Sequence, residues 1–439
     1  MAIVRKFGKP DFFITITTKL NWREITKNLY SGQSSNDRHD LIARVFKHKS
    51  DALIHDLKEN KIMGNVVYLQ STIEFQKRSL PHIHILVKVS KNDFRLTSDQ
   101  VYECAKAEFL DKEKKPRLFE IVTKTMVHSR CDISKTKVPC WNEEKNICTK
   151  KLLEQYHKVT FITSKGKVII KKSFDSLLDI IDRFDNKVNN NFCATYNLYL
   201  SLKYNSHINV KICESVLSSK YLFKYTHKSN GDNIAADVIE TVESKDEVKL
   251  HIDGRYVGPS EAVWRIMKYP ILYKDWTVVR LAVHLINEEC TVADEINNGN
   301  NNCFKAEKDY KSILVAYYNL NKNDINSRKY LFNEILEHYW FDLKTREWKL
   351  RHRQRHTIGR IFTVSPMNVE LFLLQQLLLH VPGAKFEGDL KIVNGFQWLS
   401  FRDAAIARGL LDTEDNYNEL FQEACENRCL TCFVITLVS

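Results

Sequence analysis

Two strand-like segments joined by a short polar link constrain the fold most strongly. Residues 65–76 and 82–89 are rich in β-branched and apolar residues, and segments so close together pair as an antiparallel hairpin. In the second segment two histidines, His82 and His84, alternate with two isoleucines. Successive side chains of a strand point to opposite faces, so the isoleucines face a core and both histidines face the other side. The chain is therefore expected to build a sheet with one apolar and one polar face.

Neighbouring segments supply the other parts of an α+β unit. Residues 12–18 contain β-branched and aromatic residues and predict a strand. Residues 40–57 place apolar side chains at a helical period, and residues 98–109 predict a second helix. This strand–helix–strand–strand–helix order favours an antiparallel sheet with helices on one face.

The two histidines give the sharpest chemical signal. At i and i+2 on a strand, His82 and His84 can grip one metal ion. Glu74 and Gln76 share a face of the partner strand, and the hairpin could bring one of them close. Two neutral imidazoles and one oxygen suit Mg²⁺ or Mn²⁺, which can polarise a phosphate oxygen. The alternative is a chance His-x-His whose imidazoles are hydrogen-bonded on the sheet surface.

A tyrosine-rich segment gives the second signal. On a helix Tyr221 and Tyr225 would stand one turn apart on the same face. Lys224 and Lys228 follow at matching distances, and their ammonium groups would favour attack of a phenolic oxygen on a phosphodiester. The alternative is an amphipathic helix whose tyrosines are packing residues.

Residues 111–190 are weakly patterned, rich in lysine and contain three cysteines. His128, Cys131, Cys140 and Cys148 could form a structural zinc site, although their spacing lacks a C-x-x-C knuckle. The alternative is a set of unliganded thiols.

The segment after residue 303 is expected to be mainly helical, with an amphipathic helix near 370–379. It also holds the densest basic run, which contains Arg351, Arg353 and Arg355. With Trp340 and Trp348 beside it, this run could follow a DNA backbone while aromatic rings stack on bases. The alternative is a solvated basic loop.

The charge balance favours a polyanionic partner. The 439 residues include 66 Lys and Arg against 54 Asp and Glu, for a formal charge of +12. No apolar stretch reaches the ~20 residues of a membrane span, so no membrane contact is expected. Eleven cysteines without a regular framework favour reduced thiols, and no phosphate-loop motif of an ATPase occurs.

Several longer motifs together resemble the replication-initiator domain of Helitron transposases, which are HUH endonucleases. The similarity covers about residues 7–290 and continues more loosely to about 435. Its segments, in family order, are FGKPDFFIT at 7–15, EFQKRSLPHIH at 74–84, YLSLKYN at 199–205, KYLFKY at 220–225, and DGRYV at 253–257 followed by SEAVWR at 260–265.

The resemblance implies a role for each signal. His82 and His84 become metal ligands, with Glu74 the likelier third ligand and Gln76 the alternative. Tyr221 and Tyr225 become nucleophiles that hold the 5′ end of a cleaved strand, with Lys224 and Lys228 steadying phosphate charge. The implied organisation is a first part of an HUH nuclease core at 1–110, a Cys/Lys-rich insertion at 111–195, a tyrosine-helix part at 196–292, and a mainly helical region at 303–439.

The resemblance also implies the partners. The expected substrate is single-stranded DNA rather than a small molecule, the expected location is the nucleus, and a separate helicase would supply unwinding. Family members carry a long segment before this domain and a helicase after it, so a truncated or domesticated copy is expected. The alternative to an active enzyme is a non-catalytic DNA-binding remnant of a transposon protein.

Overall fold

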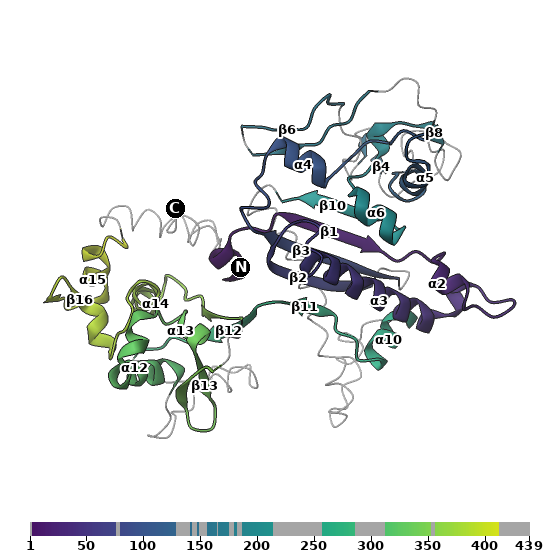
Figure 1. Cartoon of the computed structure of the whole chain (residues 1–439). Coiled ribbons are helices and arrows are strands. Elements are labelled where there is room, and N and C mark those ends of the chain that lie inside the picture. Colours follow the sequence, from purple (N-terminus) through teal and green to yellow (C-terminus); the bar gives the residue numbers. More distant parts are fainter. Residues whose placement is uncertain are drawn as a thin grey trace. The chain divides into compact units, whose positions relative to one another are not determined.

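The chain forms two compact units, Ile3–Asp275 and Trp276–Ser439, shown in Figure 1. None of the helices in the described residues is long and apolar enough to cross a membrane. The computed structural model describes residues 2–75, 80–128, 156–164, 166–174, 180–181, 187–213, 257–285, 312–352 and 356–411, and the backbone of 141–142 and 147–148.

The first unit mixes helices with strands. Its main elements are, in chain order, α1 (Ala2–Phe7), β1 (Phe12–Thr17), α2 (Arg23–Thr26), α3 (His39–Lys58), β2 (Val66–Phe75), β3 (Pro81–Val89), α4 (Ser98–Cys104), α5 (Pro116–Thr125), β4 (Trp141–Asn142), β5 (Ile147–Cys148), β6 (Phe161–Ile162), β7 (Val168–Ile169), β8 (Ile180–Ile181), β9 (Lys187–Val188), α6 (Leu198–Tyr204), β10 (Ile208–Ile212), α10 (Pro259–Ile266) and β11 (Leu272–Lys274).

A five-stranded sheet organises this unit, with strand order β10-β1-β3-β2-β11. Every neighbouring pair is antiparallel. The hairpin of β2 and β3 pairs Glu74 with His82, and β1 pairs Thr15 with His84 and Thr17 with His82. The predicted α+β architecture with an antiparallel sheet is confirmed, as are the strands expected at 12–18, 65–76 and 82–89.

One face of the sheet forms the main core. Ile14 and Ile85 are fully buried there, beneath Ile42 and Phe46 of α3. Trp264 of α10 is also fully buried in the same cluster. The helix expected at 40–57 is confirmed as α3, and its apolar side chains cover the sheet as the period predicted.

The helix expected at 98–109 is shorter, because α4 ends at Cys104. Ala105 is extended, and the backbone of Lys106 exchanges two 2.8 Å hydrogen bonds with Tyr196. A bridge to a residue 90 positions later in the chain thus replaces the last helical turn, which local sequence could not reveal.

A small second core lies within the region expected to be an insertion. Leu118 and Val122 of α5 pack with Phe192 and Tyr196. This cluster also includes Phe109, Met126, Ile180, Val188 and Cys193. The described residues of the region therefore have packing of their own beside the main sheet.

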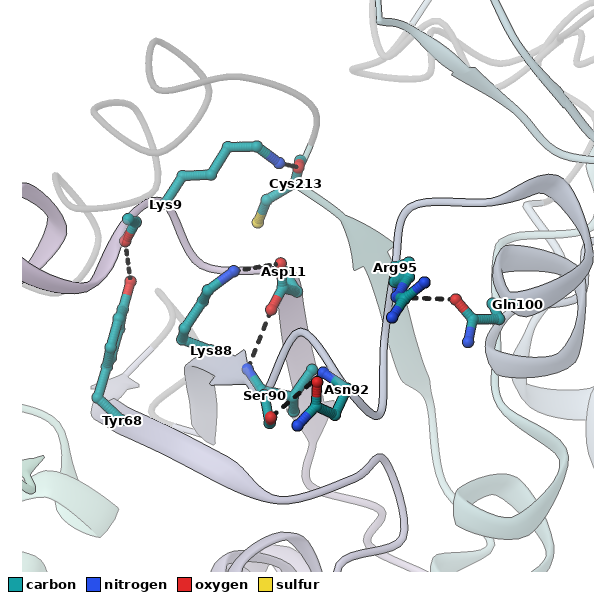
Figure 2. Close-up of polar contacts among 11 residues, drawn as sticks. Lys9, Asp11, Tyr68, Lys88, Ser90, Asn92, Arg95, Gln100 and Cys213 are labelled. Carbon is teal, nitrogen blue, oxygen red and sulfur yellow. Dashed lines mark hydrogen bonds and ion pairs between the residues drawn. The ribbon is translucent and has the colours of Figure 1, made fainter.

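The segment before β1 is tied to the sheet by polar contacts, as Figure 2 shows. Asp11 accepts hydrogen bonds from Lys88 Nζ at 2.9 Å and from the Val89 amide at 3.0 Å. The Tyr68 hydroxyl donates to the Gly8 carbonyl at 3.2 Å. Because the Asp11 carboxylate is paired with a cation, its burial is compensated, and the entry into β1 is held in place.

A buried carboxylate joins α3 to α6. Asp56, 1% exposed, accepts from Lys203 Nζ at 2.6 Å, from the Tyr204 hydroxyl at 2.7 Å and from Asn60 Nδ2 at 2.8 Å. Burial disfavours the charged form of Asp56, but these hydrogen bonds outweigh it and hold its pKa below the usual range. Near this contact, Trp22 Nε1 donates to the Tyr204 carbonyl at 2.9 Å.

The second unit has its own core, built around α14, whose Leu373, Leu374, Leu377 and Leu378 are fully buried. Burial extends around most of this helix, so the prediction of an amphipathic helix here was wrong. The elements of this unit are β12 (Thr277–Leu281), α12 (Ile313–Asn323), α13 (Ile335–His338), β13 (Tyr339–Asp342), β14 (Glu347–Leu350), β15 (Thr357–Ile361), α14 (Val369–His380), β16 (Ile392–Val393), β17 (Phe396–Gln397) and α15 (Phe401–Ala407).

Short strands accompany these helices. β12 pairs in parallel with β15, and β13 forms a hairpin with β14. We expected a mainly helical region, and these strands are additions that the sequence did not predict. Trp276–Leu285 also lies with this unit rather than with the sheet of the first one.

Replacing Asp56 with alanine is expected to lower the free energy of unfolding by about 2–4 kcal/mol, because the Tyr204 hydroxyl and the Lys203 ammonium lose a buried acceptor. Urea denaturation followed by circular dichroism measures this loss. The matched control is Asp51→Ala, which removes an exposed pair with Lys47 and should leave stability nearly unchanged. Equal denaturation midpoints for the two variants would show that Asp56 does not join the helices.

Candidate functional site

The candidate site lies on the sheet face opposite α3. Because paired residues of antiparallel strands share a face, the register gathers six side chains there from β1, β2 and β3. We call this set the histidine face; its members are Thr15, Thr17, Thr72, Glu74, His82 and His84. The two predicted histidines and the predicted carboxylate are thus brought together.

The histidine face is partly to fully buried. Thr72 is fully buried and His82 is 5% exposed, while the side chains of His84 and Glu74 are 12% and 29% exposed. Thr15 and Thr17 are also partly exposed. A polar cluster with so little exposure needs internal hydrogen bonds.

Each imidazole makes the same contact with β1. His82 Nδ1 lies 3.0 Å from Thr17 Oγ1, and His84 Nδ1 lies 3.0 Å from Thr15 Oγ1. These bonds occupy Nδ1 of both rings, so Nε2 is the nitrogen that would serve as a ligand. Reasoning from the sequence missed the two threonines, although both alternate with the apolar residues of β1 as the histidines do on β3.

His84 is held by two further groups. Its Nε2 lies 3.0 Å from Glu74 Oε2, and the Phe13 ring stacks parallel to it with centroids 5.6 Å apart. His84 is therefore contacted from β1 and β2 at once, which leaves its ring little freedom to turn.

The His82 imidazole is kept neutral. Burial and the neighbouring His84 lower the pKa of His82 from 6.5 to about 4, despite the opposing effect of Glu74. A neutral imidazole is the form that binds a metal, so this ring would not have to lose a proton near neutral pH.

The donor set fits a divalent cation. Two imidazoles and a carboxylate are ligands that Mn²⁺ or Mg²⁺ can use. Neighbouring ligands about 2.1 Å from a cation at right angles lie about 3.0 Å apart, the separation of His84 Nε2 and Glu74 Oε2. In the described part of the chain, no three His, Cys, Asp or Glu side chains converge as a ready metal centre; instead Glu74 closes against His84.

Other predicted site residues fall outside the described parts of the chain. These are Gln76, the tyrosine segment with Tyr221, Lys224, Tyr225 and Lys228, the zinc candidates Cys131 and Cys140, and the arginines Arg353 and Arg355. Their assigned roles stay predictions.

The remaining zinc candidates are described only in part. The His128 amide follows α5 and donates to the Phe192 carbonyl at 2.8 Å. Cys148 is placed by its backbone alone, which pairs with Trp141. The zinc hypothesis therefore gains no support from these positions.

The basic run of the second unit has structural contacts. Arg351 Nε donates to the carbonyls of Leu336 and Tyr339 at 2.9 and 3.0 Å. Trp348 is 7% exposed and belongs to the core, so the idea that it stacks on bases is wrong. Trp340 is 40% exposed, with Lys349 Nζ 5.7 Å from its ring centre, and remains open to a ligand.

Comparison with known protein families gives a match in the part of the chain that contains the histidine face. Residues 1–87 match the family described as the Helitron helicase-like domain at the N-terminus. The match spans the whole histidine face, so this part of the chain is similar to that domain. None of the curated proteins matches the chain.

Acid is expected to destabilise the metal-free protein between pH 6.5 and about 4 through His82. In this window the unfolded chain binds a proton at His82 that the folded chain does not, so stability falls as the pH is lowered. Urea midpoints in EDTA from pH 7.5 to 4.5 measure the effect.

The variant His82→Gln should flatten that pH dependence, whereas His48→Gln, at an exposed position of α3, should leave it as in the wild type. A wild-type slope retained in His82→Gln would contradict the assignment to this buried ring.

Proposed function

We propose that the chain is a metal-dependent DNA endonuclease and strand transferase of the Helitron type, with an HUH-type site. The observation that carries the proposal is the placement of His82, His84 and Glu74 on one face of the sheet, with both imidazoles hydrogen-bonded through Nδ1. The Helitron-like match over residues 1–87 supports it independently.

The chemistry required is transesterification of a phosphodiester. A divalent cation supplies charge that polarises the scissile phosphate. His82, His84 and Glu74 would hold that cation, and the depressed pKa of His82 would keep this ligand deprotonated at neutral pH. Their burial limits the water that competes for the phosphate.

The nucleophile would be a tyrosine. We propose that Tyr221 or Tyr225 forms an Oη–phosphorus bond while the bond from phosphorus to the 3′ oxygen breaks. The phenolic proton leaves through solvent, and the departing 3′ oxygen takes up a proton to become a hydroxyl. Bond energy is kept in the 5′-phosphotyrosine, so a free 3′ hydroxyl can later reverse the step without ATP.

The second tyrosine would allow a second strand to be held during exchange. Lys224 and Lys228 would balance the phosphate charge, and the overall charge of +12 favours a polyanionic substrate. We propose single-stranded DNA as that substrate and the nucleus as the place of action.

With Mn²⁺ or Mg²⁺, the purified protein is expected to nick single-stranded DNA and to remain attached to the 5′ end. A set of labelled oligonucleotides of varied sequence, resolved on denaturing gels, detects the covalent adduct. The double variant Tyr221→Phe/Tyr225→Phe should form no adduct. The double variant His82→Ala/His84→Ala should form the adduct at least about 100-fold more slowly.

Tyr30→Phe is the matched control, since Tyr30 is 73% exposed and far in sequence from the tyrosine segment. An adduct retained by the double tyrosine variant would overturn the proposed nucleophiles. Salt-dependent DNA binding by the wild type without any adduct would replace the enzyme by a DNA-binding remnant.

A further inference from the structure

We propose that Thr15 and Thr17 of β1 are positioning residues for the metal ligands, a role that rests on the proposed function. Their hydroxyls would fix the ring orientation of His84 and His82 and would accept a hydrogen bond from Nδ1–H when a cation is bound, so that both imidazoles present Nε2 to one cation. No catalytic step is assigned to the threonines themselves.

The repeated contact carries this inference. Two Oγ1–Nδ1 distances of 3.0 Å occur side by side, one for each candidate ligand. The register of β1 and β3 places each threonine directly opposite its histidine. Two equal contacts at successive positions of one face indicate a shared role, whereas a single one could be incidental.

The hydrogen bond suits the tautomer that a bound cation requires. A cation on Nε2 requires the ring proton to sit on Nδ1, where the N–H needs an acceptor. A threonine hydroxyl can accept a hydrogen bond from that N–H, and it can turn to donate when no cation is bound. Valine, which has nearly the same shape, can do neither.

Burial makes the orientation matter. Turning the His82 ring by 180° would carry a nitrogen away from Thr17 within a site where the residue is only 5% exposed. Little water is available to replace the lost partner, so the turn is disfavoured. For His84, the 3.0 Å contact of Nε2 with Glu74 Oε2 would be lost in the same turn, which adds a second constraint.

The strand does not need these hydroxyls for its own stability. Ile14 and Ile16 anchor β1 from the opposite face, at 0% and 2% exposure. Thr→Val keeps the branched shape that strands favour. The substitution therefore removes the orienting contact while leaving the sheet in place.

The test compares Mn²⁺ affinity by isothermal titration calorimetry in four full-length proteins. These are the wild type, Thr15→Val/Thr17→Val, Thr15→Ser/Thr17→Ser and the control Thr195→Val. The control removes a comparable 3.1 Å hydrogen bond, from Thr195 to Asn209, that involves no histidine. Circular dichroism checks that all four are folded.

The double valine variant should bind Mn²⁺ about 10- to 100-fold more weakly, the usual loss when an orienting partner of a ligand is removed. The double serine variant should recover most of the affinity, and Thr195→Val should bind like the wild type.

Unchanged Mn²⁺ affinity in the double valine variant, or serine failing to restore it, would overturn the role of the threonines while leaving the proposed function intact. A wild-type protein that binds no Mn²⁺ and forms no DNA adduct would instead remove the proposed function, and this inference with it.

Discussion

The pairing of β1 with β3 is the contact on which the rest of the first unit depends. β3 is the central strand of the sheet and β1 lies beside it, and each is bonded on both sides. Their register sends isoleucines to the helices and sends threonines and histidines to the other face. Because a slip by one residue would exchange the two faces, the core and the candidate site are specified by the same alignment. Burial of Ile14 and Ile85 thus also holds Thr15 against His84.

Much of this face could be predicted from local sequence. Because His82 and His84 alternate with isoleucines, the sequence predicts that both histidines lie on the sheet face opposite the core. The short link to the preceding strand predicts a hairpin, and in that hairpin Glu74 lies opposite His82. The threonine contacts could not be predicted in the same way. They need β1 to lie beside β3, a pairing across 65 positions that no turn or spacing in the chain specifies.

Two other features could not be predicted from the sequence: which aromatic side chains are buried, and where short strands form. Trp348 looked like a partner for bases because it directly precedes a basic run, yet it is buried in the core of the second unit. Strands of two to five residues, such as β13 and β16, carry too few side chains to display a period. The roles of Tyr221 and Tyr225 rest on sequence alone, since the structure does not describe that segment.

The two edge strands of the sheet come late in the chain, and this affects how the protein folds during its synthesis. β1, β2 and β3 are complete at Val89, but their neighbours β10 and β11 end only at Ile212 and Lys274. Roughly 185 residues separate Val89 from Lys274, so at ~5–20 residues per second the ribosome needs roughly 10–40 s to supply the last partner. The nascent three-stranded sheet has two open edges until β10 is made, and the edge at β2 stays open until β11 is made; open edges are sites of aggregation. Protection of the emerging chain, by chaperones or by its own later segments, therefore becomes part of what determines the yield of folded protein.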